Sequence, residues 1–222
     1  MSEERIGNMS EDRYWQNWDN ADVSKRIDEY WTKSEGAWRE LICKKIMNFV
    51  GTEGEILEVG CGSGLICHGL VTKGFPKSRY SGGDISEKML ELAQERFPDI
   101  SFRKIDIFNL DIPDESVDNV ICIHVVQHLP HYEDAVRELL RITKKKLYLV
   151  SWFQEEEDIT FTKAAKKWAN QRFYNNKYSL SKFEQFVNSI ADVKISKEKI
   201  LNYCWAFKIE CGYEDTGLHG KQ

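Results

Sequence analysis

A glycine-rich turn is the most informative stretch of the chain for chemistry. Residues 56–64 read Ile-Leu-Glu-Val-Gly-Cys-Gly-Ser-Gly, so a buried apolar run leads directly into the turn. Glycine lets the backbone turn tightly and approach a ligand without an intervening side chain. A dinucleotide fingerprint would need Gly or Ala at position 65 or 67, where this chain has Leu65 and Cys67, and the Gly-Lys-Ser/Thr ending of a P-loop is absent. The turn therefore does not fit the two commonest phosphate-binding loops.

The acidic residue before the turn decides which charge the ligand should carry. Glu58 stands two positions ahead of Gly60, where a carboxylate would repel a pyrophosphate but would suit an ammonium or sulfonium centre. We therefore expect a cationic ligand at this loop. The alternative is that the glycines only form a tight turn between a strand and a helix.

Two more acidic residues follow later strands of the same pattern. Asp84 ends Tyr-Ser-Gly-Gly-Asp, where a carboxylate can accept hydrogen bonds from both hydroxyls of a ribose. Alternatively, Asp84 caps a helix beside Ser86. Asp106, within Lys-Ile-Asp-Ile at 104–107, can accept from an adenine amino group while a neighbouring backbone N–H donates to a ring nitrogen. The alternative for Asp106 is a solvated acid in a loop.

Three histidines follow the fourth apolar run at spacings of four and three residues. His124, His128 and His131 could suggest metal ligation, but no carboxylate completes a His-Glu-x-x-His helix. We therefore expect no metal. Packing or solvation explains the three imidazoles, and His124 alone is a candidate for a catalytic base or for orienting a substrate.

The elements that must position these residues alternate along the chain. Short runs rich in Ile and Val alternate with stretches of helical period, which is typical of βαβ units and predicts parallel strands covered by helices. The expected strands are residues 55–60, 79–84, 101–107, 117–124 and 146–152, with helices at 86–97 and 132–142. A polar helical stretch over 155–176, a helix from Ser179 or Ser181, and an antiparallel hairpin of 193–201 with 203–211 complete the pattern. The first fifty residues add two Trp-rich helical stretches that begin near Glu11 and Val23.

Length and composition favour one folded domain. The chain has 222 residues, 41% of them hydrophobic and 30% charged, which excludes extensive disorder. Its formal charge of -5 provides no basic field, so nucleic acid is not an expected partner. The chain has no apolar run of about 20 residues and its first residues do not resemble a signal peptide, so we expect a cytoplasmic protein without a membrane partner. The six cysteines form no Cys-x-x-Cys pair and are interpreted as reduced thiols.

The motifs, taken in order, resemble the class I S-adenosylmethionine-dependent methyltransferases. The resemblance rests on residues 56–64, on Gly-Gly-Asp-Ile-Ser-Glu-Lys-Met-Leu-Glu-Leu-Ala at 82–93, on 104–107 and on 119–129, and it is greatest to the small-molecule branch related to ubiquinone biosynthesis, methyltransferase type 11/25. It implies an α/β fold of the Rossmann-like, doubly wound type: a mostly parallel seven-stranded sheet with an antiparallel C-terminal hairpin and N-terminal helices.

The resemblance also implies S-adenosylmethionine as the cofactor and a role for each motif. Glu58 and the backbone of the glycine loop would receive the methionine part, Asp84 the ribose, and the residues of the next loops the adenine. The carbonyls at the end of the fourth strand would hold the methionine ammonium. The cofactor-binding residues expected in this way are Glu58, Gly60, Cys61, Gly62, Gly64, Asp84, Ile85, Met89, Asp106, Ile107, Cys122 and Ile123.

The expected function is transfer of a methyl group to a small-molecule acceptor. An RNA or protein methyltransferase and a non-catalytic S-adenosylmethionine-binding protein are the alternatives, and neither the acceptor nor the oligomeric state can be inferred from the residues. Residues 1–50 are expected to form a helical lid within the same domain as the methyltransferase region, 51–222. In that lid, Tyr14, Trp15 and Trp18 would close over the ligand.

Overall fold

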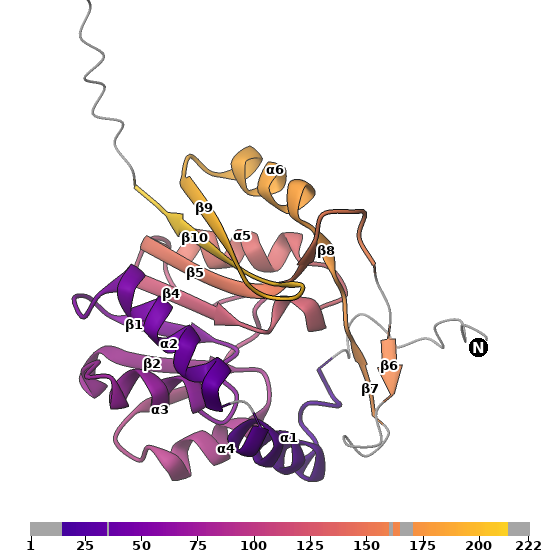
Figure 1. Ribbon diagram of the computed structural model, residues 1–222. Coiled ribbons are helices and arrows are strands. Elements are labelled where there is room, and N and C mark those ends of the chain that lie inside the picture. The colour runs from indigo at the N-terminus through magenta and orange to yellow at the C-terminus, as the bar shows by residue number, and fades with distance from the viewer. Residues whose placement is uncertain (1–14, 35, 160–161, 165–170, 213–222) are drawn as a thin grey trace, which may run out of the picture.

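The computed structural model describes residues 15–34, 36–159, 162–164 and 171–212 (Figure 1). The helices are α1 (Ala21–Ser34), α2 (Gly36–Val50), α3 (Leu65–Thr72), α4 (Glu87–Arg96), α5 (Glu133–Ile142) and α6 (Leu180–Ile190). The strands are β1 (Ile56–Val59), β2 (Tyr80–Asp84), β3 (Ser101–Lys104), β4 (Val117–Ile123), β5 (Thr143–Gln154), β6 (Thr162–Ala164), β7 (Arg172–Tyr174), β8 (Tyr178–Ser179), β9 (Lys194–Leu201) and β10 (Cys204–Glu210). Short 3-10 turns cover Lys77–Arg79 and Val126–His128.

The central sheet has the strand order β3-β2-β1-β4-β5-β10-β9. Its first five strands are parallel to one another, and β10 runs antiparallel to its two neighbours, β5 and β9. The α/β fold with a mostly parallel sheet and an antiparallel C-terminal hairpin is therefore confirmed. The predicted seven strands form this path, and the short β8 adds an eighth strand that pairs with the end of β5.

The direction of the chain across the sheet reverses between β1 and β4. β2 and β3 extend the sheet on one side of β1, whereas β4 and β5 extend it on the other. The loops that leave β1 and β4 consequently separate at their carboxyl ends, and a crevice forms there, which is where open α/β sheets bind ligands. The glycine loop after β1 and the histidine-bearing turn after β4 both lie at this position.

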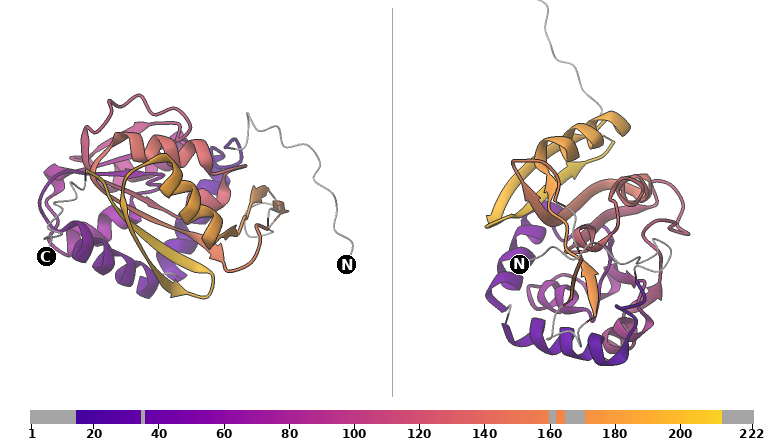
Figure 2. Two further views of the ribbon diagram at one scale, coloured as in Figure 1. Left: turned by 90° about the horizontal axis from the view of Figure 1, so that it is seen from above. Right: turned by 90° about the vertical axis from the view of Figure 1, so that its right-hand side faces the viewer.

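Alternating side chains of the strands supply the two faces of the core. Leu57 of β1 and Cys122 of β4 face a layer that contains α5 and α6, whereas their neighbours Ile56 and Ile121 pack against α2 and α3. Both faces of the parallel strands are thus covered by helices, as Figures 1 and 2 show. This double cover explains the continuous buried runs at 120–123 in β4 and 147–150 in β5.

Several predicted elements have different bounds in the structure. Residues 15–19 form a turn and α1 begins at Ala21, while residues 11–14 lie outside the described residues. The helical stretch predicted over 155–176 is wrong for the described part, which contains the antiparallel pair β6 and β7. β3 ends at Lys104 rather than at Ile107, and β5 begins directly after α5. In the part of the chain that the structure describes, no helix is both long and apolar enough to cross a membrane.

Candidate active site

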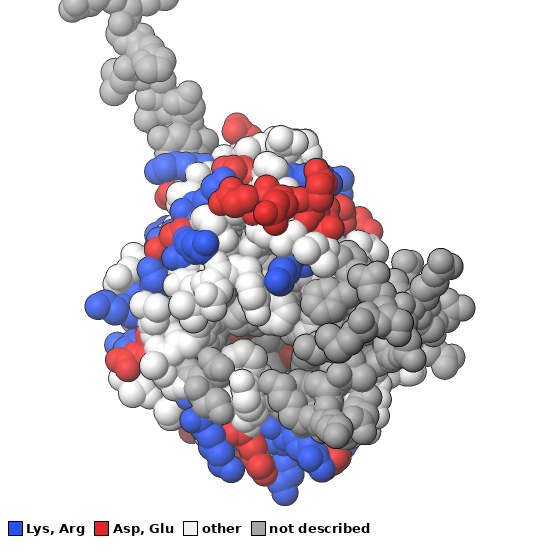
Figure 3. All heavy atoms as spheres, turned by 45° about the vertical axis from the view of Figure 1, so that its right-hand side comes forward, with Lys and Arg blue, Asp and Glu red and all other residues white. Residues whose placement is uncertain are grey.

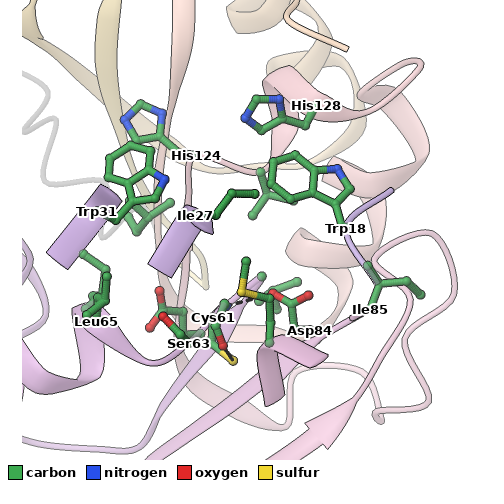
Figure 4. A pocket seen from close by; sticks show the side chains of 18 of the residues that line it. Trp18, Ile27, Trp31, Cys61, Ser63, Leu65, Asp84, Ile85, His124 and His128 are labelled. Atoms are coloured by element: carbon green, nitrogen blue, oxygen red, sulfur yellow. Dashed lines mark hydrogen bonds between the residues drawn. The ribbon is translucent and has the colours of Figure 1, made fainter. Parts of the chain in front are cut away.

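A pocket lies at the carboxyl ends of β1, β2 and β4. It is bounded by the glycine loop, by the turn after β4, and by the N-terminal segment with α1 and α2. Figure 3 shows a hollow near the middle of this face whose visible rim is mostly uncharged, and Figure 4 shows the pocket from close by. The residues that line it are Trp18, Ile27, Asp28, Trp31, Trp38, Arg39, Glu58, Val59, Gly60, Cys61, Gly62, Ser63, Leu65, Ile66, Asp84, Ile85, Met89, Ile105, Ile107, Ile123, His124, Val125, His128 and Leu129.

The glycine loop is held in shape by backbone hydrogen bonds. The carbonyl of Gly83 accepts from the N–H groups of Gly60 and Cys61 at 2.7 and 3.0 Å. Gly60 has φ +79°, and a Cβ there would lie 2.1 Å from a methyl group of Val125, so only glycine fits. Gly62 also has positive φ, but a Cβ on it would meet no atom within 4 Å among the described residues. The loop thus leaves open space above Gly62, as a loop that approaches a ligand must.

Asp84 connects this loop to the start of α4. One carboxylate oxygen accepts from the N–H of Gly62 at 2.8 Å, and the other accepts from the N–H of Ser86 at 2.9 Å. Ser86 itself caps α4, since its hydroxyl oxygen accepts from the N–H of Met89. Each oxygen of Asp84 keeps a further lone pair for a hydroxyl donor. Burial raises the pKa of Asp84, while its backbone hydrogen bonds oppose that rise.

Glu58 lies beneath the loop and is 1% exposed. Its carboxyl group accepts a hydrogen bond from the hydroxyl of Tyr80 on β2. Burial is the main cause that raises the pKa of Glu58 to about 8, and the nearby Asp84 adds to the rise. A cation bound at the loop would favour the ionised carboxylate and so would bring this pKa down.

Most of the predicted site residues line the pocket. They are Glu58, Gly60, Cys61, Gly62, Asp84, Ile85, Met89, Ile107, Ile123, His124 and Trp18. Gly64, Asp106 and Cys122 do not line it: Gly64 precedes α3, Cys122 is buried in β4, and Asp106 accepts from the N–H of Phe108. Trp15 does not line the pocket, and the ammonium group of Lys104 lies over its ring. Tyr14 lies outside the described residues.

The helical part of the wall contains residues that the sequence motifs did not identify. Ile27 and Trp31 of α1 and Trp38 of α2 line the pocket, and so do Ser63 and Ile105. Ile27 and Trp31 are four residues apart, and this spacing in the sequence places both side chains on one face of α1. It indicates an apolar face but does not say that the face covers a ligand site.

Polar contacts fasten the N-terminal segment over the loop. The carboxylate of Asp28 on α1 accepts from Arg96 Nη2 at 3.0 and 3.2 Å and from the hydroxyl of Ser63. Arg96 also donates to the carbonyl of Ser63. The residues just before α1 are also held. The carbonyl of Trp18 accepts from the hydroxyl of Ser86 at 2.9 Å, and the carboxylate of Asp19 accepts from the N–H of Lys88 at 3.1 Å. The segment is thereby joined to both the glycine loop and α4.

His124 has both ring nitrogens engaged. It follows directly after β4 with φ +57°, and its Nδ1 lies 3.0 Å from Nε2 of Gln127, whose own oxygen accepts from Ser151. Its Nε2 lies 3.8 Å from Sγ of Cys204. The ring also stacks at 4.8 Å on Trp38. Burial lowers the pKa of His124 to about 3, so the imidazole is neutral.

His128 has a different arrangement. Its Nδ1 lies 2.6 Å from the carbonyl oxygen of Tyr174, and because a carbonyl only accepts, Nδ1 carries the proton. The ring contacts Trp18 at 4.9 Å and Trp152 at 5.7 Å. Burial lowers the pKa of His128 to about 4. His131 lies outside the pocket lining near Glu133, and the described residues contain no cluster of His, Cys, Asp or Glu that could hold a metal ion.

Comparison with known proteins supports the interpretation of these loops. The profile of the methyltransferase-domain family matches residues 57–151. A ubiquinone biosynthesis O-methyltransferase of Alkalilimnicola ehrlichii is 33% identical over 100 residues, which cover 42% of this chain and 39% of that protein. A phosphatidylethanolamine N-methyltransferase of Cereibacter sphaeroides is 31% identical over 110 residues, covering 47% of this chain and 53% of that protein. The chain thus spans about two fifths to one half of these curated relatives.

Solved structures share the fold over most of the chain. A candidate S-adenosylmethionine-dependent methyltransferase from Methanococcus maripaludis superposes with a TM-score of 0.67 at 18% identity, covering 97% of this chain and 99% of that one. The complex of DhpI with S-adenosylhomocysteine gives a TM-score of 0.63 at 18% identity, covering 86% and 94% of the two chains. Residues 57–151 are thus similar to the methyltransferase-domain family, and the solved structures share the Rossmann-like fold of the chain.

Proposed function

We propose that this protein is an enzyme that transfers a methyl group from S-adenosylmethionine to a small-molecule acceptor. The observation that carries this proposal is the continuity of the pocket, which joins the glycine loop and Asp84 to an aromatic end around Trp31, Trp38 and His124. Methyl transfer needs a cofactor and an acceptor in line within one water-excluded cavity. A pocket with both a polar and an aromatic end meets that need.

The polar end would hold the cofactor. Asp84 has acceptor capacity on both carboxylate oxygens for the ribose hydroxyls, and Ile85 and Met89 offer apolar contacts for the adenine. Glu58 and the open space above Gly62 suit the cationic methionine part. Ile105 and Ile107 line the pocket around Asp106, so the adenine edge would meet this loop mainly through its backbone and apolar groups.

The aromatic end would hold the acceptor. Trp and His side chains dominate it, and both His imidazoles are neutral because burial lowers their pKa values. The relatives named for ubiquinone and for phosphatidylethanolamine methylation act on molecules with apolar parts, which supports an apolar acceptor here. The formal charge of -5 argues against an RNA acceptor.

The N-terminal segment would act as a lid within the same domain. Trp18, Ile27 and Trp31 cover the pocket, and the contacts of Asp28 with Arg96 and Ser63 hold α1 against the loop. Entry of the cofactor would require this segment to move. The cytoplasmic location and the assignment of residues 51–222 to a single methyltransferase domain stay predictions.

Calorimetry and a methylation screen test the proposal together. We expect S-adenosylhomocysteine to bind, and labelled S-adenosylmethionine to methylate at least one member of a metabolite pool, read by mass spectrometry. Labelling of RNA or protein in place of metabolites would support the macromolecular alternative. Binding without any transfer would support the non-catalytic alternative, and absence of binding would refute the cofactor site itself.

A further inference from the structure

We propose that His128 accepts the acceptor's proton during methyl transfer, through its Nε2 atom, and that the acceptor is an uncharged molecule that presents a hydroxyl group. This inference rests on the proposed methyl transfer and specifies its proton acceptor and its substrate class. It is carried by the contacts that fix the ring of His128 at the aromatic end of the pocket.

The contact with β7 determines which nitrogen of His128 can act as a base. Nδ1 donates to the carbonyl of Tyr174 at 2.6 Å, so the proton of the neutral ring is on Nδ1. Nε2 then carries a lone pair, and among the described residues it has no hydrogen-bond partner. His128 lines the pocket, and Figure 4 shows its ring beside Trp18, at the end of the pocket remote from Asp84.

The surroundings of the ring favour an uncharged acceptor. Trp18 and Trp152 contact the imidazole, and the neighbouring lining residues Val125 and Leu129 are apolar. The charged lining residues already have partners. Asp28 is paired with Arg96, and Arg39 donates to the carbonyl of Trp31. Glu58 accepts from Tyr80, and Asp84 accepts from the N–H of Gly62. No described carboxylate or cation is positioned to neutralise a charged acceptor next to His128.

A hydroxyl acceptor requires a proton acceptor of this kind. The bound cofactor supplies a methyl group on a sulfonium: the oxygen–methyl bond forms as the sulfur–methyl bond breaks, and sulfur keeps the electron pair. The hydroxyl proton becomes strongly acidic as its oxygen shares electrons with the methyl carbon, so a weakly basic imidazole is sufficient to remove it. The proton passes to Nε2 of His128, and the resulting imidazolium returns it to solvent after the product leaves.

His124 is less suited to the same step. Its Nδ1 is occupied by Gln127 and its Nε2 faces the thiol of Cys204, so proton uptake would disrupt one of these contacts. Through its stacking on Trp38, His124 instead shapes the wall against which an acceptor would pack. The predicted catalytic role of His124 thus becomes one of orienting the acceptor.

Nitrogen-15 NMR of the histidine rings tests the inference without turnover. In the protein saturated with S-adenosylhomocysteine, we expect His128 to be the Nδ1–H tautomer with an unprotonated Nε2. Addition of catechol should shift the Nε2 resonance of His128 through a new hydrogen bond. A proton on Nε2, or an unchanged resonance at millimolar catechol, would overturn the inference.

Variant kinetics provide the second test. His128→Asn places an amide N–H near the position of Nδ1, so it can keep the contact with Tyr174 while removing the base. We expect S-adenosylhomocysteine affinity to be unchanged and methyl transfer to catechol to fall by about 100-fold or more in kcat, with little change in KM. His131→Asn is the matched control, because His131 lies in the same loop outside the pocket lining.

The outcomes separate this inference from the proposed function. Equal rates for His128→Asn and the wild type would refute the role of His128, and transfer to aniline but not to catechol would refute the hydroxyl class. Failure of the wild type to bind S-adenosylhomocysteine would refute the methyltransferase proposal instead.

Discussion

Replacement of Asp84 by Asn should weaken cofactor binding strongly. Both oxygens of Asp84 accept from backbone N–H groups, those of Gly62 and Ser86. An Asn side chain has only one acceptor oxygen, so in either orientation its NH₂ group faces one of these donors. A hydrogen bond to a charged group contributes about 1.5–3 kcal/mol, and every 1.4 kcal/mol corresponds to roughly tenfold in affinity. Since the same carboxylate would also receive the ribose, we expect S-adenosylhomocysteine affinity to fall about 10- to 100-fold.

Calorimetry at one fixed salt concentration measures this loss, and thermal unfolding of the ligand-free variant separates it from global destabilisation. Asp111→Asn is the matched control, because Asp111 is exposed in the loop after β3 and lies outside the pocket lining. A folded Asp84→Asn protein that binds S-adenosylhomocysteine as tightly as the wild type would refute the assigned role of this carboxylate.

Four further results are expected. The protein should bind S-adenosylhomocysteine and not NAD in calorimetry, because Glu58 and Leu65 do not suit a pyrophosphate; micromolar NAD binding would contradict this. Trp18→Ala should loosen S-adenosylhomocysteine binding and reduce the fluorescence change on binding, and unchanged values would show that Trp18 only packs on His128 and Phe173. Arg96→Met should expose α1 to limited proteolysis, because Asp28 loses a partner that is largely shielded from solvent. A digestion pattern like that of the wild type would show that the ion pair of Asp28 with Arg96 does not hold α1 in place. The pKa of Glu58 in the folded state, about 8, lies above that of an unfolded Glu, so Glu58 lowers the stability of the ligand-free protein progressively as pH rises from 5 to 8. In urea unfolding, Glu58→Gln should therefore gain stability relative to the wild type as pH rises over this range. A difference in stability that does not change with pH would refute the raised pKa of the buried Glu58 carboxyl.

Local signals were sufficient for the parts of the fold where packing and sequence pattern agree. β1, α4 and α5 could be predicted because apolar runs, a capping serine and an i, i+3, i+4 face each point to one element. The glycine loop and Asp84 could be predicted because a turn with positive φ restricts the residue type at Gly60.

Contacts between distant segments could not be predicted in this way. The polar stretch after β5 has a helical period, yet its described residues pair as β6 with β7, and Phe173 of β7 packs beside Ile27 and Met89. The hydrogen bond between His128 and Tyr174 joins residues far apart in sequence, so the tautomer of the ring cannot be inferred from the His spacing. Similarly, the position of Trp38 in the pocket depends on how α2 lies against the sheet.

The two outer strands of the sheet also bear on how copies of the chain meet one another. β3 and β9 end the strand order, and each carries exposed basic residues: Arg103 and Lys104 on β3, and Lys194, Lys197 and Lys199 on β9. An unpaired strand edge is a template for aggregation, because its backbone groups can bind the edge of another molecule. A second copy that added its own β9 to this one in parallel and in register would bring lysines opposite lysines, and like charges directly opposite each other destabilise a strand pair. The charge pattern of these edges therefore opposes edge-to-edge fibre growth at neutral pH, and high salt should weaken that opposition.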